Sequence, residues 1–158
     1  MTRPSWHETW MSITRLVAER SYDPRLKVGA IIVSEDNAVM LALGYNGNAK
    51  GLPNVPESNE PGASAFLHAE ENCLIKAPHH YPLPKVMYLT HSPCSMCAKR
   101  IINAGISRVI YDVEYRDSSG VGLLRQVGIR VERYEDLAAK PSSVRDADWS
   151  LEPDELKF

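Results

Sequence analysis

Two short motifs in this chain contain side chains that commonly bind metal ions and move protons. His68 and Glu70 occur together in the sequence H-A-E, and Cys94 and Cys97 occur in the sequence P-C-S-M-C. One imidazole and two thiolates are a typical set of zinc ligands, and three such ligands leave the fourth tetrahedral position to water. A carboxylate beside that position is better suited to carry protons than to bind the metal. We therefore expect His68, Cys94 and Cys97 to bind one zinc ion, with Glu70 as the proton carrier.

The spacing of the two cysteines also fits a metal site at the start of a helix. Residues three apart lie on the same face of a helix, so both sulfurs would point the same way. The unpaired N–H groups and the dipole at a helix N-terminus favour the thiolate form. Taken alone, P-C-x-x-C could be a thioredoxin-like redox motif, and a lone H-x-E is most often solvated. Together, each opening a helix with one strand between them, the two motifs have the pattern of the zinc nucleobase deaminases.

The chemistry expected of such a site follows from its residue types. Zinc lowers the pKa of a bound water toward neutrality, which makes hydroxide available to attack the amine-bearing carbon of a cytosine-type ring. Glu70 would take the proton of the water, pass it to the ring nitrogen and later help to protonate the departing ammonia. A carboxylate kept beside a buried metal hydroxide should have a raised pKa, which suits this role.

The composition of the chain excludes several other classes of protein. Of its 158 residues, 44% are hydrophobic and 24% are charged, which fits one folded domain rather than a disordered segment. A net charge of −2 gives no electrostatic footprint for nucleic acid or for an anionic membrane. The three cysteines cannot all pair within one chain, and the N-terminus has no signal-peptide pattern, which argues against a disulfide scaffold. We expect a soluble, cytoplasmic protein with no membrane or nucleic-acid partner.

The hydrophobic pattern predicts an α/β fold in which helices alternate with strands after an opening hairpin. The expected elements are a helix over 5–19, strands over 28–33 and 38–45, a helix over 65–76, a strand over 85–90, a helix over 95–104, a strand over 107–111, a helix over 121–127 and a strand over 129–134. This order indicates three α/β/α layers around a five-stranded mixed sheet, parallel from the third strand onward. The site should lie at the carboxyl ends of strands. The Gly-, Pro- and Asn-rich stretch 46–63 is expected to be a long loop.

The C-terminal segment differs in composition from the rest of the chain. Residues 135–158 contain seven acidic residues, three basic residues and two prolines. We expect a deaminase domain over 1–134 and an acidic tail over 135–158. The apolar residues Trp149, Leu151 and Leu156 suggest that this tail packs on or near the domain or on a neighbouring subunit.

Beyond the metal motifs, most of the chain between residues 10 and 134 resembles the deoxycytidylate (dCMP) deaminase family of the cytidine deaminase superfamily. The motifs that carry the resemblance are R-S-x-D-P at 20–24, K-V-G-A at 27–30, G-Y-N-G at 44–47, H-A-E-E-N at 68–72, S-P-C-S-M-C-A-K at 92–99, Y-R-D at 115–117 and L-L-R-Q-V-G-I at 123–129. The resemblance implies the cytidine deaminase-like version of the predicted fold. It also implies that one zinc ion is bound per chain, since no fourth cysteine is present for a second site.

The resemblance further implies residues that contact the nucleotide. Asn46 would lie near the sugar or, with Gly44, Tyr45 and Gly47, form a regulatory nucleotide loop. Arg20, Ser21 and Tyr115 are the candidates for the phosphate end of the substrate. For three of these positions a structural role is the alternative: Arg20 as a solvated residue at a helix end, Asn46 as a turn residue, and Tyr115 as a cap on the sheet edge.

The implied reaction is the zinc-dependent hydrolysis of dCMP to dUMP and ammonia, which supplies the precursor for dTMP synthesis. The alternatives are a deaminase that prefers C5-modified dCMP such as 5-methyl-dCMP, a tRNA adenosine deaminase, and a zinc-binding module without catalysis. Members of the family are typically homo-oligomers, often hexamers, with dCTP as activator and dTTP as inhibitor. Such regulation is plausible here, with Mg²⁺ accompanying a regulatory nucleotide.

Four further residues have simpler interpretations. Cys73 is expected to be a small buried thiol that packs like alanine. His91 is expected to hydrogen-bond the backbone rather than to change the wall of the base site. His79 and His80, between two prolines, are expected on the surface.

Overall fold

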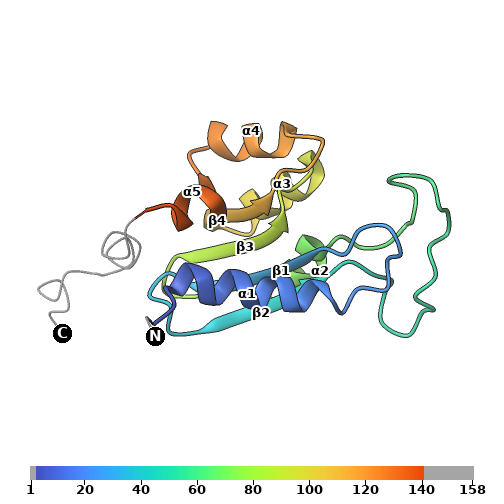
Figure 1. The fold of residues 1–158 in the computed structure, drawn as a ribbon, viewed down its shortest axis with the longest axis horizontal. Coiled ribbons are helices and arrows are strands. Elements are labelled where there is room, and N and C mark those ends of the chain that lie inside the picture. The colour runs from blue at the N-terminus through green and yellow to red at the C-terminus, as the bar shows by residue number, and fades with distance from the viewer. Residues whose placement is uncertain (1–2, 141–158) are drawn as a thin grey trace, which may run out of the picture.

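The computed structural model describes residues 3–140, and these form five helices and five strands (Figure 1). In chain order the elements are α1 (Trp6–Ala18), β1 (Gly29–Ser34), β2 (Met40–Tyr45), α2 (Ala69–Lys76), β3 (Lys85–His91), α3 (Ser95–Asn103), β4 (Ile106–Val113), α4 (Ser119–Gln126), β5 (Arg130–Arg133) and α5 (Tyr134–Ala138). The nine elements expected from the sequence are all present. None of the helices in the described part of the chain is long and apolar enough to span a membrane.

The strands form one mixed sheet in the order β2-β1-β3-β4-β5. β1 pairs antiparallel with both β2 and β3, whereas β3 with β4 and β4 with β5 are parallel. The predicted hairpin and the parallel arrangement from the third strand onward are therefore confirmed. β1 and β3 lie inside the sheet and are almost entirely buried, because helices cover both of their faces.

Helices cover both faces of the sheet, so the three-layer α/β/α arrangement is also confirmed (Figure 1). On one face, Trp10 and Met11 of α1 and Leu137 of α5 belong to one apolar cluster. On the other face, α2, α3 and α4 pack together over a second cluster that includes Ile101 and Leu124. The sheet is thus held between two cores, and α2 and α3 lie side by side on the same face.

The start of α2 differs from the sequence prediction. The helix begins at Ala69 rather than near residue 65, because Ala65 has a φ of 57°, in the left-handed region that non-glycine residues rarely adopt. His68 is extended and precedes the first helical residue as the N-cap. The backbone thus turns sharply just before the helix, and the imidazole of His68 lies at the N-terminal end of α2.

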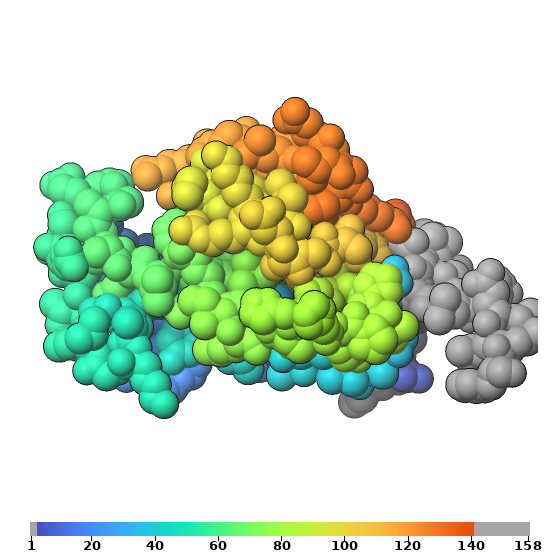
Figure 2. All heavy atoms as spheres, turned by 180° about the vertical axis from the view of Figure 1, so that it is seen from behind, coloured from blue at the N-terminus to red at the C-terminus, as the bar shows by residue number. Residues whose placement is uncertain are grey.

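The long loop expected over 46–63 is present and extends away from the sheet (Figure 1). Its stems are joined where Gly47 and Leu67 exchange two backbone hydrogen bonds, with N···O distances of 3.1 and 2.9 Å. Figure 2 shows this loop, in teal to green, protruding at one end of the molecule. The bridge fixes the spacing of Asn46 and His68, which lie next to it on the side away from the loop.

The first residues of the expected C-terminal tail are helical. α5 places Leu137 in the core with only 2% of its surface exposed, and the helix packs against α1. The remaining residues of the expected tail, including Trp149, Leu151 and Leu156, lie outside the described residues. The division of the chain at residue 134 stays a prediction.

Candidate active site

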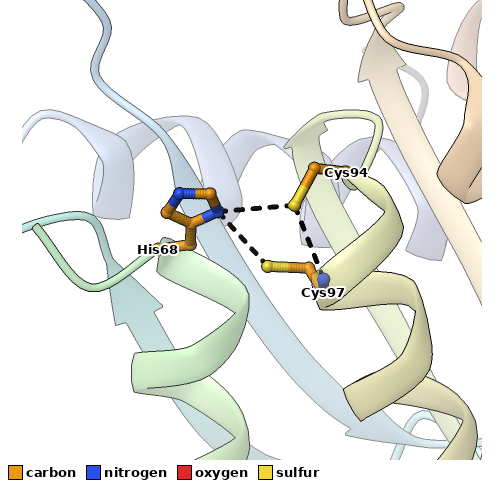
Figure 3. A group of neighbouring side chains, drawn as sticks. All are labelled: His68, Cys94 and Cys97. Atoms are coloured by element: carbon orange, nitrogen blue, oxygen red, sulfur yellow. Dashed lines mark hydrogen bonds between the residues drawn. The ribbon is translucent and has the colours of Figure 1, made fainter. Parts of the chain in front are cut away.

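The three expected metal ligands come together at the adjacent N-terminal ends of α2 and α3 (Figure 3). His68 Nδ1 lies 3.7 Å from Cys94 Sγ and 3.3 Å from Cys97 Sγ. The ligand atoms of all three residues lie within 4.8 Å of one another. In the part of the chain that the structure describes, this is the one group of three or more such side chains close enough to share a metal ion.

The distances and donor types of this group fit zinc. Zinc–sulfur bonds of about 2.3 Å and zinc–nitrogen bonds of about 2.0 Å at tetrahedral angles would place sulfur and nitrogen roughly 3.5 Å apart. The two observed sulfur–nitrogen distances, 3.7 and 3.3 Å, lie on either side of this value. Hydrogen bonds with Cys97 and His68 lower the pKa of Cys94, which favours the thiolate form of its sulfur. The site therefore suits a soft divalent cation that accepts thiolate and imidazole ligands.

Two local motifs hold the ligands in place. Glu71 accepts a hydrogen bond from the backbone N–H of His68 at 2.9 Å, which caps the start of α2. The same carboxylate forms an ion pair with Arg100 of α3, also at 2.9 Å. Cys94 is the N-cap of α3, and its sulfur accepts a hydrogen bond from the backbone N–H of Cys97. Glu71 thus links the start of α2, where His68 lies, to the last turn of α3.

Glu70 has the properties expected of a proton carrier at this site. Only 4% of its surface is exposed, and its side chain lines the same pocket as His68 and Cys94. Burial raises the pKa of Glu70 to about 7, although its own backbone N–H and the nearby His68 act in the opposite direction. A carboxyl with this pKa can accept or release a proton near neutral pH.

The pocket above the metal group has an apolar wall and a polar rim. Val28 and Phe66 contribute to the apolar part of the wall, and Asn46, His91 and Tyr115 contribute polar groups. Phe66 is 7% exposed and belongs to the segment that leads into His68. The pocket can therefore hold a planar ring against the metal group and Glu70.

Asn46 lines this pocket, but its side-chain amide is bonded within the protein. Its Oδ1 accepts from the backbone N–H of Val28 at 2.8 Å, and its Nδ2 donates to the carbonyl of Leu26 at 2.8 Å and to Asp23 at 3.2 Å. The hydroxyl of Ser21 donates to the backbone carbonyl of Asn46. Asn46 thus anchors the segment that precedes β1 to the end of β2.

The other nucleotide-binding candidates occupy different places. Tyr115 lines the pocket, whereas Arg20 is exposed and Ser21 is buried, and neither of these two is among the lining residues. Gly44 lies so close to α2 that a Cβ atom there would be 2.4 Å from the backbone nitrogen of Cys73. The carbonyl of Tyr45 accepts a hydrogen bond from Asn72 of α2.

The expectation for His91 is wrong, because its ring lies in the pocket wall. Its Nδ1 is 3.0 Å from the hydroxyl of Thr90, so the hydrogen bond is to a side chain rather than to the backbone. Burial lowers the pKa of His91, which favours the neutral imidazole. Cys73, by contrast, is a fully buried core residue as expected, and burial raises the pKa of its thiol to about 12.

The structure also identifies two basic residues that the sequence analysis did not select. A second pocket adjoins the first and shares its lining residues Asp23, Leu26, Ser64, His91 and Tyr115. This outer pocket contains Arg25 and Arg116. Arg25 directly follows the motif R-S-x-D-P at 20–24, and Arg116 lies within Y-R-D at 115–117, but their spacing of 91 positions gives no signal that they share a pocket.

The chain has a mixed five-stranded sheet, a metal group of one histidine and two cysteines, and a buried glutamate beside that group. These features define a cytidine deaminase-like zinc enzyme. The chain matches the model of the cytidine and deoxycytidylate deaminase zinc-binding region over residues 4–113. It therefore belongs to the cytidine and deoxycytidylate deaminase family.

Individual relatives agree with this assignment. ComE operon protein 2 of Bacillus subtilis is 35% identical over 143 residues, which cover 85% of this chain and 74% of that protein. Deoxycytidylate deaminase of Saccharomyces cerevisiae is 33% identical over 146 residues, which cover 85% of this chain but only 46% of the yeast protein. Among solved structures, dCMP deaminase from the cyanophage S-TIM5 in complex with dCMP and dUMP has a TM-score of 0.75 and 36% identity, over 84% of this chain and 99% of that chain.

Proposed function

We propose that this protein catalyses the hydrolytic deamination of dCMP to dUMP with release of ammonia. The observation that carries the proposal is the buried Glu70 beside a three-ligand metal group in one pocket. The substrate is supported by the relatives, since the yeast protein is named deoxycytidylate deaminase and the cyanophage enzyme was solved with dCMP and dUMP. The product dUMP would supply the synthesis of dTMP.

The residues of the pocket would have different roles in the reaction. His68, Cys94 and Cys97 would hold Zn²⁺, which when bound supplies a Lewis acid that makes hydroxide available from water near neutral pH. Glu70 would accept the proton that the water loses and donate it to the ring nitrogen of cytosine. The regenerated carboxylate would then take the proton of the hydroxyl that has been added to the amine-bearing carbon and pass it to the amino group, so that the carbon–nitrogen bond breaks, ammonia leaves and the carbonyl forms. The apolar wall that includes Phe66 would keep bulk water away from the ring.

The decisive experiment is ammonia release by the zinc-loaded protein, comparing the unmodified chain with Glu70→Gln. We expect turnover of dCMP by the unmodified chain and a loss of at least about 100-fold in Glu70→Gln, with zinc content and unfolding temperature unchanged. Glu71→Gln would disturb the cap of α2 and the ion pair with α3, so the matched control is Glu35→Gln in the exposed turn between β1 and β2. Full activity of Glu70→Gln would contradict the proposed role of this carboxylate.

The same assay separates the alternative substrates. Offering 5-methyl-dCMP, cytidine, dCTP and a tRNA anticodon stem-loop beside dCMP measures tolerance at C5 and the requirement for a monophosphate. Turnover restricted to monophosphates supports the proposal, and preferential turnover of the tRNA fragment would contradict it. Zinc binding without turnover of any substrate would favour a zinc-binding module without catalysis.

We further propose one zinc ion per chain, a cytoplasmic location and a homo-oligomer, with a hexamer as the expected size. We also propose that dCTP, with Mg²⁺, activates and dTTP inhibits through the segment over 44–47, which comprises the end of β2 and the two residues after it. The support is the similarity of its G-Y-N-G sequence to the family. Light scattering and initial rates with and without each nucleotide test these points separately from turnover.

A further inference from the structure

We propose that Asn46 is a latent modification site: when the chain around it opens, its side-chain amide is lost as ammonia and the residue becomes aspartate or isoaspartate. The folded protein blocks this reaction by holding both of the groups that take part in it. The inference goes beyond the proposed function and does not depend on it, because no nucleotide takes part in the modification.

Asn46 precedes a glycine, which makes it the most reactive asparagine of the unfolded chain. The chain contains seven asparagines, and Asn46 is the one that is followed by glycine, whereas the others precede Ala, Val, Glu or Cys. The backbone nitrogen of the next residue is the nucleophile in asparagine deamidation. Glycine leaves this nitrogen unhindered because it has no Cβ atom. Gly47 therefore supplies the nucleophile that reacts most readily.

The reaction is balanced with water as its co-reactant. The backbone nitrogen of Gly47 loses its proton and attacks Cγ of Asn46, so that a carbon–nitrogen bond forms, and Nδ2 takes up a proton and leaves as ammonia. The product is a cyclic succinimide. Water then opens this ring: attack at Cγ gives aspartate, and attack at the backbone carbonyl carbon gives isoaspartate, in which the main chain runs through the former side chain.

The nucleophile is occupied in the folded protein. The backbone N–H of Gly47 donates to the carbonyl of Leu67 at 3.1 Å, and the N–H of Leu67 donates in return at 2.9 Å. Gly47 is itself buried. To attack Cγ, its nitrogen has to give up this hydrogen bond and transfer its proton to a base, which a neutral carbonyl is not. The bridge between the loop stems must therefore open before the reaction can start.

The amide of Asn46 is held by three further hydrogen bonds. Its Oδ1 accepts from the N–H of Val28, and its Nδ2 donates to the carbonyl of Leu26 and to Asp23. Asp23 also closes the turn that carries these partners, because it accepts the backbone N–H groups of Arg25 and Leu26. Only 8% of the surface of Asn46 is exposed, so little water reaches it. Nδ2 cannot leave as ammonia until these bonds break.

The products do not fit the place of Asn46. An aspartate there can still accept from the N–H of Val28, but it has no N–H for the carbonyl of Leu26, and its charge would face the carboxylate of Asp23. Isoaspartate would also lengthen the main chain between β2 and the bridge. The turn before β1, which forms part of the pocket wall, would then be unable to close as before. A chain that has once opened thus carries a permanent mark beside its pocket.

Peptide mapping by mass spectrometry tests the site after incubation at mildly alkaline pH in heavy-oxygen water, which labels the asparagines that react during the incubation. In guanidinium chloride, Asn46 should react before the other asparagines. In the folded, zinc-loaded protein it should stay unmodified over the same time. Gly47→Ala should remove the lead of Asn46 in guanidinium chloride. This variant fits the fold, because the nearest atom to its Cβ would be Oδ1 of Asn54 at 3.4 Å.

Asp23→Ala tests the hydrogen bonds in the folded protein. It removes one acceptor of the amide and opens the turn that carries another, so Asn46 should be modified while circular dichroism still shows a folded chain. If this variant does not fold, Ser21→Ala replaces it, since the hydroxyl of Ser21 binds the carbonyl of Asn46 and the N–H of Asp23. The matched control is Asp36→Ala, because Asp36 accepts the N–H of Ala38 in a similar turn at the opposite end of β2. This control should leave Asn46 unmodified.

Asn46→Asp reproduces the aspartate product directly. Its unfolding temperature should be lower than that of Asn48→Asp, which loses only a hydrogen bond to the carbonyl of Pro53 in the exposed loop. Four results would overturn the inference: equal modification of Asn46 in folded and unfolded protein, no lead of Asn46 in the unfolded chain, equal modification in Asp23→Ala and Asp36→Ala, or equal stability of the two aspartate variants. None of these measurements uses turnover, so their outcome is separate from that of the proposed reaction.

Discussion

Replacing Gly120 with alanine tests how closely α4 must approach the metal group. Gly120 lies in the first turn of α4, and a Cβ atom there would be 2.0 Å from the carbonyl oxygen of Pro93 and 2.7 Å from that of Cys94. Ordinary van der Waals contact begins at 3.4 Å, so the backbones must separate by about 1.4 Å in Gly120→Ala. Because Cys94 belongs to the candidate metal group and is the N-cap of α3, this movement directly disturbs that group.

The expected loss of stability and of zinc affinity is large, although Gly120→Ala removes no functional group. Overpacking of this kind typically destabilises a protein by about 1–3 kcal/mol, and contact with backbone rather than with a flexible side chain favours the upper end. Groups that orient a metal ligand typically change metal affinity by about 10- to 100-fold when they are disturbed. We therefore expect a loss of about 3 kcal/mol in the free energy of unfolding, together with zinc binding at least about 10-fold weaker.

Gly122→Ala in the same helix is the matched control. A Cβ atom at Gly122 meets nothing within 4 Å, so alanine there should keep zinc affinity and stabilise the protein by up to about 1 kcal/mol. Competition with a chromophoric chelator measures zinc affinity, and urea unfolding measures stability. If Gly120→Ala matched Gly122→Ala in both measurements, the close approach of α4 to Cys94 would not be needed for stability or for zinc binding.

Three further predictions concern the turn before β2, the thiols and the pocket wall. Asn37→Gly removes the acceptor of the Trp10 indole N–H, 2.7 Å away, and should cost about 1–3 kcal/mol in chemical unfolding. Asn37→Ala should cost about 1 kcal/mol more, because Asn37 has a φ of 61°, and equal stability of the two variants would contradict this. A chelator should make Cys94 and Cys97 reactive toward a thiol reagent, and labelling of both before metal removal would argue against their role as ligands. Because burial lowers the pKa of His91, the unfolded chain binds this proton more readily. The stability of the unmodified protein relative to His91→Gln should therefore fall as the pH drops below about 6.5, and a constant difference between pH 5 and pH 8 would refute this.

The sequence was sufficient to predict the sheet and the grouping of His68, Cys94 and Cys97, because the patterns that carry both predictions are short-range. Apolar runs of strand length and the three-residue spacing of Cys94 and Cys97 are visible within a few positions. The start of α2 could not be predicted, since helix propensity does not reveal that Ala65 adopts a left-handed backbone conformation. Likewise, α5 is too short to have a recognisable period, and burial against α1 explains why it forms.

The residues around the metal group could not be predicted from the sequence, because long-range packing brings them together. Arg25 and Arg116 lie in two loops that the sheet brings to one pocket, and nothing in their local sequences distinguishes them from solvated arginines. Asn46 lines the pocket, and its contact with a nucleotide stays a prediction, but only the folded structure identifies the backbone groups that its amide binds. The wall position of His91 was missed because the last residue of a strand can face either a pocket or the solvent.

The hydrogen-bonded bridge between Gly47 and Leu67 separates the loop tip from the catalytic framework. Since the bridge already sets the distance between the loop stems, residues 49–58 can change in length without moving Asn46 or His68. Doubling a loop costs only about 0.6 kcal/mol in closure entropy, so such changes are inexpensive for folding. This segment is therefore a natural place for sequence divergence and for grafting: a foreign peptide inserted there would leave the metal centre assembled beneath it.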